Sequence, residues 1–145
     1  MPSQRKIVSA KRGLKILPTA TVGHSIENLR DEGYLDGIVQ GDCITVLKSL
    51  PNSAINLVIT SPPYFKQRDY GSGIGNEKTV DEYIDNLINV FLECVRVLSD
   101  EGSIVFNLGD KYLDGSLQLI PYSFALKAVK ACSVKLVNNI TLLKN

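Results

Sequence analysis

The feature that most constrains the fold is a short apolar run that stops at two prolines. Residues 55–60 read INLVIT, and Ser61-Pro62-Pro63-Tyr64 follows directly. An apolar, β-branched run without alternation is typical of a strand that is covered on both faces in a parallel sheet. Proline cannot donate to the ladder of a central strand, so the chain must leave the sheet at this point. The sequence therefore predicts a buried strand with a rigid exit.

Apolar periodicity before and after this strand predicts alternating strands and helices. The predicted strands cover residues 37–41, 55–60, 103–108 and 134–143. The predicted helices cover residues 43–50, residues 79 to about 99–102, and residues 116–130, the last with its helix proper starting near residue 120. Thr79 and Glu82 supply a capping box for the second helix, and Pro121 falls in the first turn of the third, where proline is tolerated. This order is typical of an α/β fold, so we expect a mostly parallel sheet with flanking helices.

Composition limits the classes of protein to which the chain can belong. With 145 residues, 44% hydrophobic, 21% charged and a net charge of +1, it is long enough for one domain with a core. It has no apolar run of membrane-spanning length and no secretory signal pattern, so we expect a cytoplasmic protein without a membrane partner. The three scattered cysteines, Cys43, Cys94 and Cys132, lack metal-ligand spacing and fit reduced thiols. We therefore expect no metal site.

Residues 1–36 show weak periodicity and many turn formers, which predicts an N-terminal extension before a domain over residues 37–145. The first 17 residues contain no acidic side chain and five basic ones, at Arg5, Lys6, Lys11, Arg12 and Lys15. Two interpretations remain open for this segment. One is a disordered arm without a specific role, and the other is an arm that contacts nucleic-acid phosphates.

Polar residues follow three of the predicted strands. They are Asp42, then Thr60 with Ser61, and then Asn107 with Asp110. Because the carboxyl ends of parallel strands meet at one edge of a sheet, where α/β proteins bind ligands, we expect these side chains to converge. Each has a simpler alternative, since Asp42 would also serve as a helix N-cap, and Asn107 and Asp110 would also serve as turn formers.

The Ser61-Pro62-Pro63-Tyr64 exit gives this edge a specific chemistry. Each proline fixes its own φ, lacks an N–H and holds the preceding residue in an extended conformation. The result is a rigid edge of outward carbonyls without adjacent backbone donors, next to an aromatic ring. Such a surface suits a planar molecule with an amino group, because the carbonyl and hydroxyl accept the amino protons and Tyr64 stacks on the ring.

The segments GDCITVLKSLPNSAINLVITSPPY, TSPPYFKQRDYG and GSIVFNLGDKY resemble the DNA amino-methyltransferases, and most closely their permuted β type, in which the catalytic motif precedes the methyl-donor motif. In that family the tetrapeptide (S/N/D)-P-P-(Y/F) follows a strand. The serine form is typical of cytosine-N4 enzymes, whereas adenine-N6 enzymes more often carry Asp or Asn at the position of Ser61. The resemblance covers roughly residues 37–145 and implies a partial Rossmann-like methyltransferase fold.

The resemblance implies methyl transfer from S-adenosylmethionine to the exocyclic amine of a flipped base in double-stranded DNA, as in restriction–modification systems. Cytosine N4 is the preferred target, and adenine N6 is the alternative. The implied residues are catalytic Ser61, Pro62, Pro63 and Tyr64, cofactor-binding Asp42 and Thr60, and substrate- or DNA-contacting Lys66, Arg68, Asn107 and Asp110. For Lys66 and Arg68, a solvated loop remains the open alternative.

Two features of the resembled family are not found in residues 1–145. One is the donor motif (D/N)-P-F-x-G-S-G-T, and the other is a target-recognition region. We therefore expect an N-terminal catalytic-motif portion, either a fragment or one subunit of a split enzyme whose second polypeptide carries the donor-binding half. Such a chain is expected to bind S-adenosylmethionine weakly and to have little activity alone. A non-catalytic α/β fragment or partner subunit is the alternative.

Overall fold

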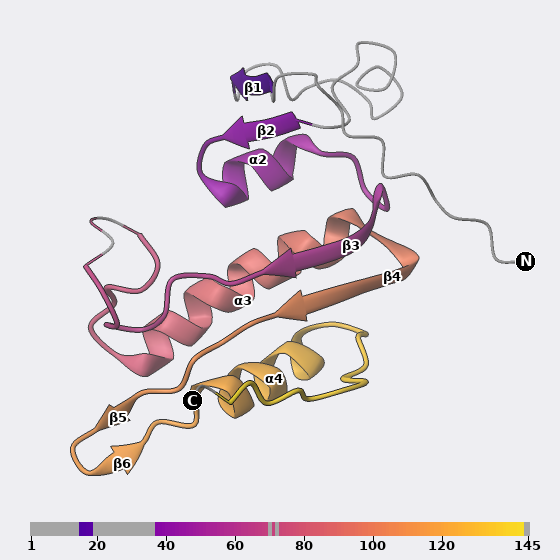
Figure 1. Ribbon diagram of the computed structural model, residues 1–145. Helices are drawn as coiled ribbons and strands as arrows, with labels where there is room; N and C mark the ends of the chain where they lie inside the picture. Colours follow the sequence, from indigo (N-terminus) through magenta and orange to yellow (C-terminus); the bar gives the residue numbers. More distant parts are fainter. Residues whose placement is uncertain (1–14, 19–36, 70, 72, 144–145) are drawn as a thin grey trace, which may run out of the picture. The chain divides into compact units, whose positions relative to one another are not determined.

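Two pairs of parallel strands organise the chain, one pair in each of its two units (Figure 1). The computed structural model describes residues 15–18, 37–69, 71 and 73–143. The N-terminal unit is Met1–Leu50 and the C-terminal unit is Pro51–Asn145. We describe each unit by itself, and most of the predicted N-terminal extension lies outside the described residues.

The N-terminal unit contains a short parallel strand pair and one helix. Strand β1 (Lys15–Pro18) pairs with β2 (Gly37–Gln40), and helix α2 (Cys43–Ser49) follows. The structure confirms the predicted strand β2 and the predicted helix α2. Strand β1 was not predicted, because four residues that end in a proline carry too little periodicity to be recognised without their partner strand.

The C-terminal unit is built on strands β3 (Ile55–Thr60) and β4 (Leu98–Phe106), joined by helix α3 (Val80–Val97). The two strands run parallel, as predicted, with Thr60 opposite Phe106 in the register. Strand β4 begins directly after α3 rather than at residue 103. The α/β class with parallel strands and helices is therefore confirmed.

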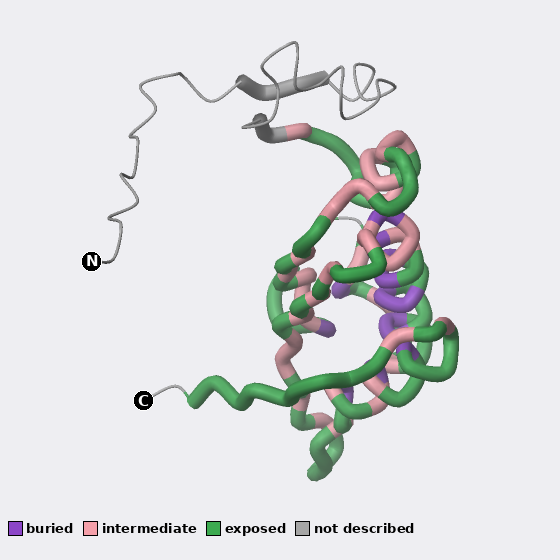
Figure 2. The backbone as a smooth tube through the Cα atoms, turned by 90° about the vertical axis from the view of Figure 1, so that its right-hand side faces the viewer, coloured by how far each residue is buried: buried purple, intermediate pink, exposed green. Residues whose placement is uncertain are grey.

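Helix α3 begins at the predicted capping box. The Thr79 side chain accepts a hydrogen bond from the Glu82 backbone N–H at 3.2 Å, and the Glu82 carboxylate accepts one from the Thr79 N–H at 3.4 Å. One stripe of α3 is buried, which gives the unit most of its core (Figure 2). The buried residues of α3 are Tyr83, Ile84, Leu87, Ile88, Val90, Phe91, Cys94 and Val97.

Helices α3 and α4 (Ile120–Ala131) pack against the same face of the β3–β4 sheet. Phe106 of β4 stacks on Phe124 of α4 with ring centroids 5.0 Å apart, and Phe91 of α3 meets the edges of both rings at 5.7 Å. Residues on the other face remain exposed by 47–70%, and they are Leu57, Ile59 and Val105. The expectation that β3 is covered on both faces is wrong, because the helices described in this unit cover only one.

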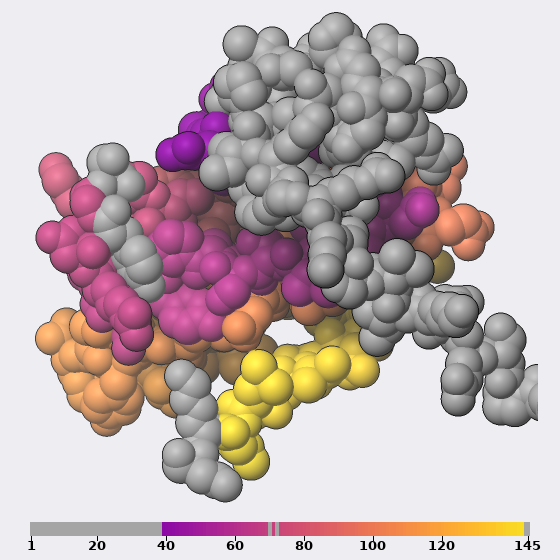
Figure 3. Space-filling view, turned by 45° about the horizontal axis from the view of Figure 1, so that its top comes forward, coloured from indigo at the N-terminus to yellow at the C-terminus, as the bar shows by residue number. Residues whose placement is uncertain are grey.

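A small hairpin and an extended tail complete the unit. Strands β5 (Tyr112–Leu113) and β6 (Ser116–Leu117) pair antiparallel around a two-residue turn at Asp114 and Gly115, both with positive φ. The strand predicted over residues 134–143 is wrong. This segment forms no ladder, and it stands apart from the rest of the unit along part of its length (Figure 3). Val134 packs against the core, but the large apolar residues from Leu136 onward are exposed. β-branched residues favour an extended chain, but a strand also needs a neighbour with which to pair.

Candidate functional site

The carboxyl ends of β3 and β4 meet, as the sequence predicts. The Asn107 backbone N–H donates to the Thr60 carbonyl at 2.8 Å, which extends the strand pairing by one step. The Asn107 side-chain amide then donates to the Ser61 hydroxyl at 3.4 Å. Two of the three predicted strand ends are therefore joined by direct contacts. The third, at Asp42, belongs to the N-terminal unit and is described separately.

Ser61, Pro62, Pro63 and Tyr64 line an open depression of about 230 Å³ at this strand end. The Ser61 hydroxyl donates to the Tyr64 hydroxyl at 3.3 Å, so the serine and the aromatic ring face the same space. No cis peptide bond occurs in the described chain, so both prolines follow trans bonds. The arrangement places a hydroxyl, proline carbonyls and a half-buried ring beside one another.

The Tyr64 ring leans against Gly109, which follows β4. A Cβ atom built on Gly109 would lie 2.8 Å from the ring, closer than real Cβ contacts allow. Glycine is therefore needed here because the ring approaches the backbone. Sequence reasoning gave Gly109 no role in the site and missed this contact. A glycine after a strand gives no indication of which side chain will occupy the space that it leaves.

Hydrogen bonds of Lys66 and Lys111 stabilise the loop that follows the motif. Lys66 has a positive φ of 46°, its backbone N–H donates to the Gly75 carbonyl at 2.7 Å, and its ammonium group donates to the Lys78 carbonyl at 3.0 Å. The ammonium group of Lys111 donates to the Lys66 carbonyl at 3.1 Å. Lys66 is thus engaged within the loop, and sequence reasoning missed the contribution of Lys111.

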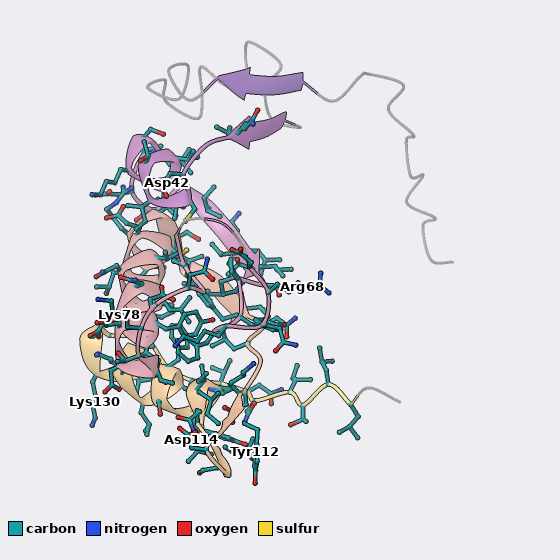
Figure 4. The ribbon with its side chains drawn as sticks, turned by 90° about the vertical axis from the view of Figure 1, so that its left-hand side faces the viewer. Asp42, Arg68, Lys78, Tyr112, Asp114 and Lys130 are labelled. Atoms are coloured by element: carbon teal, nitrogen blue, oxygen red, sulfur yellow. The ribbon has the colours of Figure 1, made fainter. Side chains whose placement is uncertain are left out.

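Arg68 lies in the same loop, is exposed and projects outward from the ribbon (Figure 4). Its guanidinium group is therefore accessible to a ligand outside the loop. Lys78, which ends the loop, is also exposed, and its side chain is labelled in the same view. The predicted contacts of Lys66 and Arg68 with DNA stay predictions.

Asp110 connects the end of β4 to the start of α4. One of its carboxylate oxygens accepts hydrogen bonds from the backbone N–H groups of Lys111 at 2.8 Å and Ile120 at 3.2 Å. Leu119, which precedes α4, has a left-handed φ of 53° and supplies no side-chain cap, so Asp110 caps the helix from outside it. These contacts are structural, and the predicted substrate role of Asp110 stays a prediction.

Asp42 is the N-cap of α2. Its Oδ1 atom accepts hydrogen bonds from both the backbone N–H and the hydroxyl of Thr45 at 2.9 Å. These two bonds, the backbone one above all, lower the pKa of Asp42, so the carboxylate is ionised at neutral pH. Desolvation, followed by the Asp42 charge, raises the pKa of the adjacent Cys43 thiol, although the residue as a whole is exposed. Cys43 is therefore a poor nucleophile at neutral pH.

Helix α3 reaches the motif through Tyr83, for which the sequence predicted no role in the site. The Tyr83 hydroxyl donates to the Pro63 carbonyl at 2.8 Å. A tyrosine among aliphatic core positions was the only signal in the sequence, because buried tyrosine hydroxyls usually have a hydrogen-bond partner. The identity of that partner depends on the fold.

Neither a metal-binding cluster nor a membrane-spanning helix occurs among the described residues. No group of His, Cys, Asp and Glu side chains within them is arranged to hold a metal ion. None of the helices there combines the length and apolar character needed to cross a membrane.

Type II methyltransferases are among the known proteins that this chain resembles in sequence. Type II methyltransferase M.MwoI of Methanothermobacter wolfeii is 42% identical over 99 residues, which are 64% of this chain and 15% of that protein. Type II methyltransferase M.XycI of Xanthomonas campestris pv. cyanopsidis is 42% identical over 81 residues, which are 54% of this chain and 27% of that protein. The chain thus spans between 15% and 27% of the length of these two curated relatives.

The fold has a counterpart among solved structures. The PvuII DNA methyltransferase (cytosine-N4-specific) superposes with a TM-score of 0.53 and 28% identity, over 63% of this chain and 32% of that chain. The sequence model of the family described as DNA methylase matches residues 55–145, which include β3, the Ser61-Pro62-Pro63-Tyr64 exit, α3, β4 and α4. Because this match extends over more than half of the 145 residues, the chain belongs to the DNA methylase family.

Proposed function

We propose that the chain is the catalytic-motif portion of an enzyme that transfers a methyl group from S-adenosylmethionine to the exocyclic amine of a base in double-stranded DNA. The observation that carries this proposal is the grouping of Ser61, the proline pair and Tyr64 around one depression, where the serine hydroxyl meets the tyrosine hydroxyl at 3.3 Å. Membership of the DNA methylase family supplies the reaction class. The flipped base stacks on Tyr64, which recovers part of the cost of extrusion from the duplex.

The chemistry requires that a weak nucleophile be activated without a covalent intermediate. The lone pair of an exocyclic amine is delocalised into the base. Acceptors at the Ser61 hydroxyl and the Pro62 carbonyl would bind the amino protons and favour a tetrahedral nitrogen, whose lone pair would bond to the methyl group as the methyl–sulfur bond of the donor breaks. The donor would leave as a neutral thioether, and the amine would release one proton to solvent. Because these acceptors are held by the proline pair, little reorganisation accompanies the reaction. No cysteine is required.

Cytosine N4 is the target that we favour over adenine N6. The serine at position 61 supports this choice, and so does the PvuII structure, which is named as a cytosine-N4-specific enzyme. Mass spectrometry of nucleosides from methylated DNA distinguishes the two products. Detection of N6-methyladenine as the main product would contradict the choice while leaving the reaction class in place.

S-adenosylmethionine supplies an electrophilic methyl group, and the chain provides only part of a site for it. The ionised carboxylate of Asp42 suits a hydroxyl of the donor, and Thr60 precedes the catalytic exit. The glycine-rich donor motif of the resembled family is not present in residues 1–145. We therefore assign the remaining donor contacts to a second segment or polypeptide. On this proposal, Lys66, Arg68, Asn107 and Asp110 contribute to the substrate side.

The dependence on a donor-binding half is tested with the chain itself. The full chain is incubated with DNA and labelled S-adenosylmethionine, alone and together with the donor-binding half of a relative such as M.XycI. We expect little transfer from the chain alone and transfer when both parts are present. Robust transfer by the chain alone would contradict the assignment of donor contacts to another segment. Transfer by neither sample, with the intact relative active, would contradict the proposed function.

A further inference from the structure

Tyr83 places a hydroxyl group in the core of the C-terminal unit, where it contacts the catalytic motif. The residue is fully buried, at 0% exposure, and its hydroxyl donates to the Pro63 carbonyl at 2.8 Å. A buried hydroxyl without a partner destabilises the folded state, and phenylalanine would fill the same apolar space without that risk. The bond to Pro63 is therefore a contribution of tyrosine at this position that phenylalanine could not make.

The bond acts on the one soft backbone dihedral angle that the proline pair retains. The rings of Pro62 and Pro63 fix both φ angles, and Pro63 also restricts the ψ angle of Pro62. Only the ψ angle of Pro63 stays free between the proline pair and Tyr64. The direction of the Pro63 carbonyl follows this angle, because the peptide unit is planar. A hydrogen bond to that carbonyl therefore sets where the backbone of Tyr64 begins.

The donor is itself rigidly held. Tyr83 lies in the first turn of α3, directly after the capping box, and its backbone N–H donates to the Thr79 carbonyl at 3.2 Å. Its ring packs against Phe65 with centroids 5.5 Å apart. The hydroxyl that binds the Pro63 carbonyl is therefore held in place by the first turn of α3.

We propose that Tyr83 is a positioning residue that sets the orientation of the Tyr64 ring through the Pro63 carbonyl. The inference rests on the proposed function in one respect, since it assumes that this ring stacks on the target base. Tyr83 acts from the backbone side, while Gly109 leaves the space into which the ring leans. Loss of the hydroxyl releases the ψ angle of Pro63, so the ring samples several orientations and stacks less often.

The orientation of Tyr64 is measurable without any ligand. The full chain, which has six tyrosines, is labelled with 3-fluorotyrosine, and the Tyr64 fluorine resonance is assigned by its loss in Tyr64→Phe. In Tyr83→Phe we expect this resonance to shift at least about half of the way toward its position in the urea-unfolded chain, as averaging over orientations requires. Titration with cytidine then reports stacking, and we expect about five- to tenfold weaker binding in Tyr83→Phe.

The matched control is Tyr112→Phe. The Tyr112 hydroxyl also donates to a backbone carbonyl at 2.8 Å, that of Gly115 in the β5–β6 hairpin, so its loss removes the same type of bond elsewhere. The positioning role is overturned if Tyr83→Phe and Tyr112→Phe show the same Tyr64 resonance position and the same affinity for cytidine. This holds even if Tyr83→Phe has a lower melting temperature. Failure of the proposed function is separately visible. If the Tyr64 resonance does not move when nucleosides are added to the chain with Tyr83 intact, the proposed base site is contradicted. The shift measured without ligand still tests whether Tyr83 orients the Tyr64 ring.

A second pair of variants keeps the test decisive if Tyr83→Phe does not fold. Tyr83 is replaced by 4-aminophenylalanine, which keeps an N–H donor at the ring tip, or by 4-methylphenylalanine, which has nearly the same size and no donor. We expect the amino variant to restore the Tyr64 resonance and the methyl variant to leave it shifted. Equal spectra from the two variants would contradict the proposal.

Discussion

At the scale of single residues, the candidate site depends on a few close contacts around Tyr64. Asn107 and Ser61 link the two strand ends, Gly109 leaves room for the ring, and Tyr83 holds the preceding carbonyl. Lys66 and Lys111, two basic residues near the motif, contact the loop backbone. The ammonium groups of Lys66 and Lys111 bind backbone carbonyls, so they stabilise the loop.

Replacement of Gly109 by alanine tests the close approach of the Tyr64 ring. The new Cβ would lie 2.8 Å from the ring, so the ring must move. We expect Gly109→Ala to lower the free energy of unfolding by about 1–3 kcal/mol, as overpacking does, in a urea titration. In a Tyr64→Ala background the same substitution should cost little, because the obstacle is gone. If Gly109→Ala lowers the free energy of unfolding equally with Tyr64 and with alanine at position 64, the strain does not come from the Tyr64 ring.

The cap of α2 gives a pH dependence of known sign. The pKa of Asp42 is lowered in the folded state, chiefly by the Thr45 backbone N–H, so its stabilisation is complete above the unfolded value and is lost as pH falls through the folded one. We expect the Thr45 amide resonance to report loss of the cap below about pH 4. Asp42→Asn keeps a capping oxygen that does not titrate there, so its amide should show no such transition.

The parts of the candidate site whose geometry follows from covalent structure were predictable from sequence. The parts whose geometry depends on packing were not. Proline imposes the rigid exit at Pro62 and Pro63 in any fold, so the sequence alone indicated it. The convergence of Ser61 and Asn107 followed from the parallel order of the strands. The contacts of Tyr83 and Gly109 required the path of α3 and β4 across the sheet, and no local pattern contains that information.

At the scale of elements, α3 is the support of the site, and its start is the most testable part. Thr79→Ala removes the side-chain partner of the Glu82 N–H. We expect a loss of about 1 kcal/mol in the free energy of unfolding, the usual effect of removing an N-cap. Thr79→Ser keeps the hydroxyl and should lose only a fraction of this, whereas an equal loss in both variants would show that the cap hydroxyl contributes nothing.

The two faces of the β3–β4 sheet should respond differently to substitution. Ile59 is 70% exposed, whereas Leu87 of α3 is fully buried beneath the opposite face. We expect Ile59→Thr to change the free energy of unfolding by less than about 0.5 kcal/mol and Leu87→Ala to lower it by about 2–5 kcal/mol. Chemical denaturation of the full chain measures both. A cost for Ile59→Thr as large as that for Leu87→Ala would show that the exposed face is covered in solution.

Elements with a strong periodic signal were predicted, and those that depend on a partner were not. The capping box and apolar stripe identify α3 from sequence, since both are local. Strand β1 and the β5–β6 hairpin are too short for a pattern. The segment over residues 134–143 was predicted as a strand but forms none. Its composition favours an extended strand, but no described segment pairs with it.

At the scale of the whole molecule, the proposed function assigns the base side of a methyl-transfer site to this chain and the donor side to another segment. A chimera tests this directly. The segment of M.MwoI that aligns with this chain is replaced by the corresponding residues, including the Ser61-Pro62-Pro63-Tyr64 exit. Ser61→Ala and Tyr64→Ala are made in the same chimera, and Tyr112→Phe serves as the control.

The decisive measurement is the amount of methylated nucleoside that each chimera forms in DNA, quantified by mass spectrometry after a fixed time with S-adenosylmethionine. We expect N4-methylcytosine from the parent chimera and from the Tyr112→Phe control. We expect about 100-fold less product from Ser61→Ala, the scale on which loss of one preorganised group slows a reaction. Methylation at the parent rate by both Ser61→Ala and Tyr64→Ala would contradict the assignment of the catalytic motif.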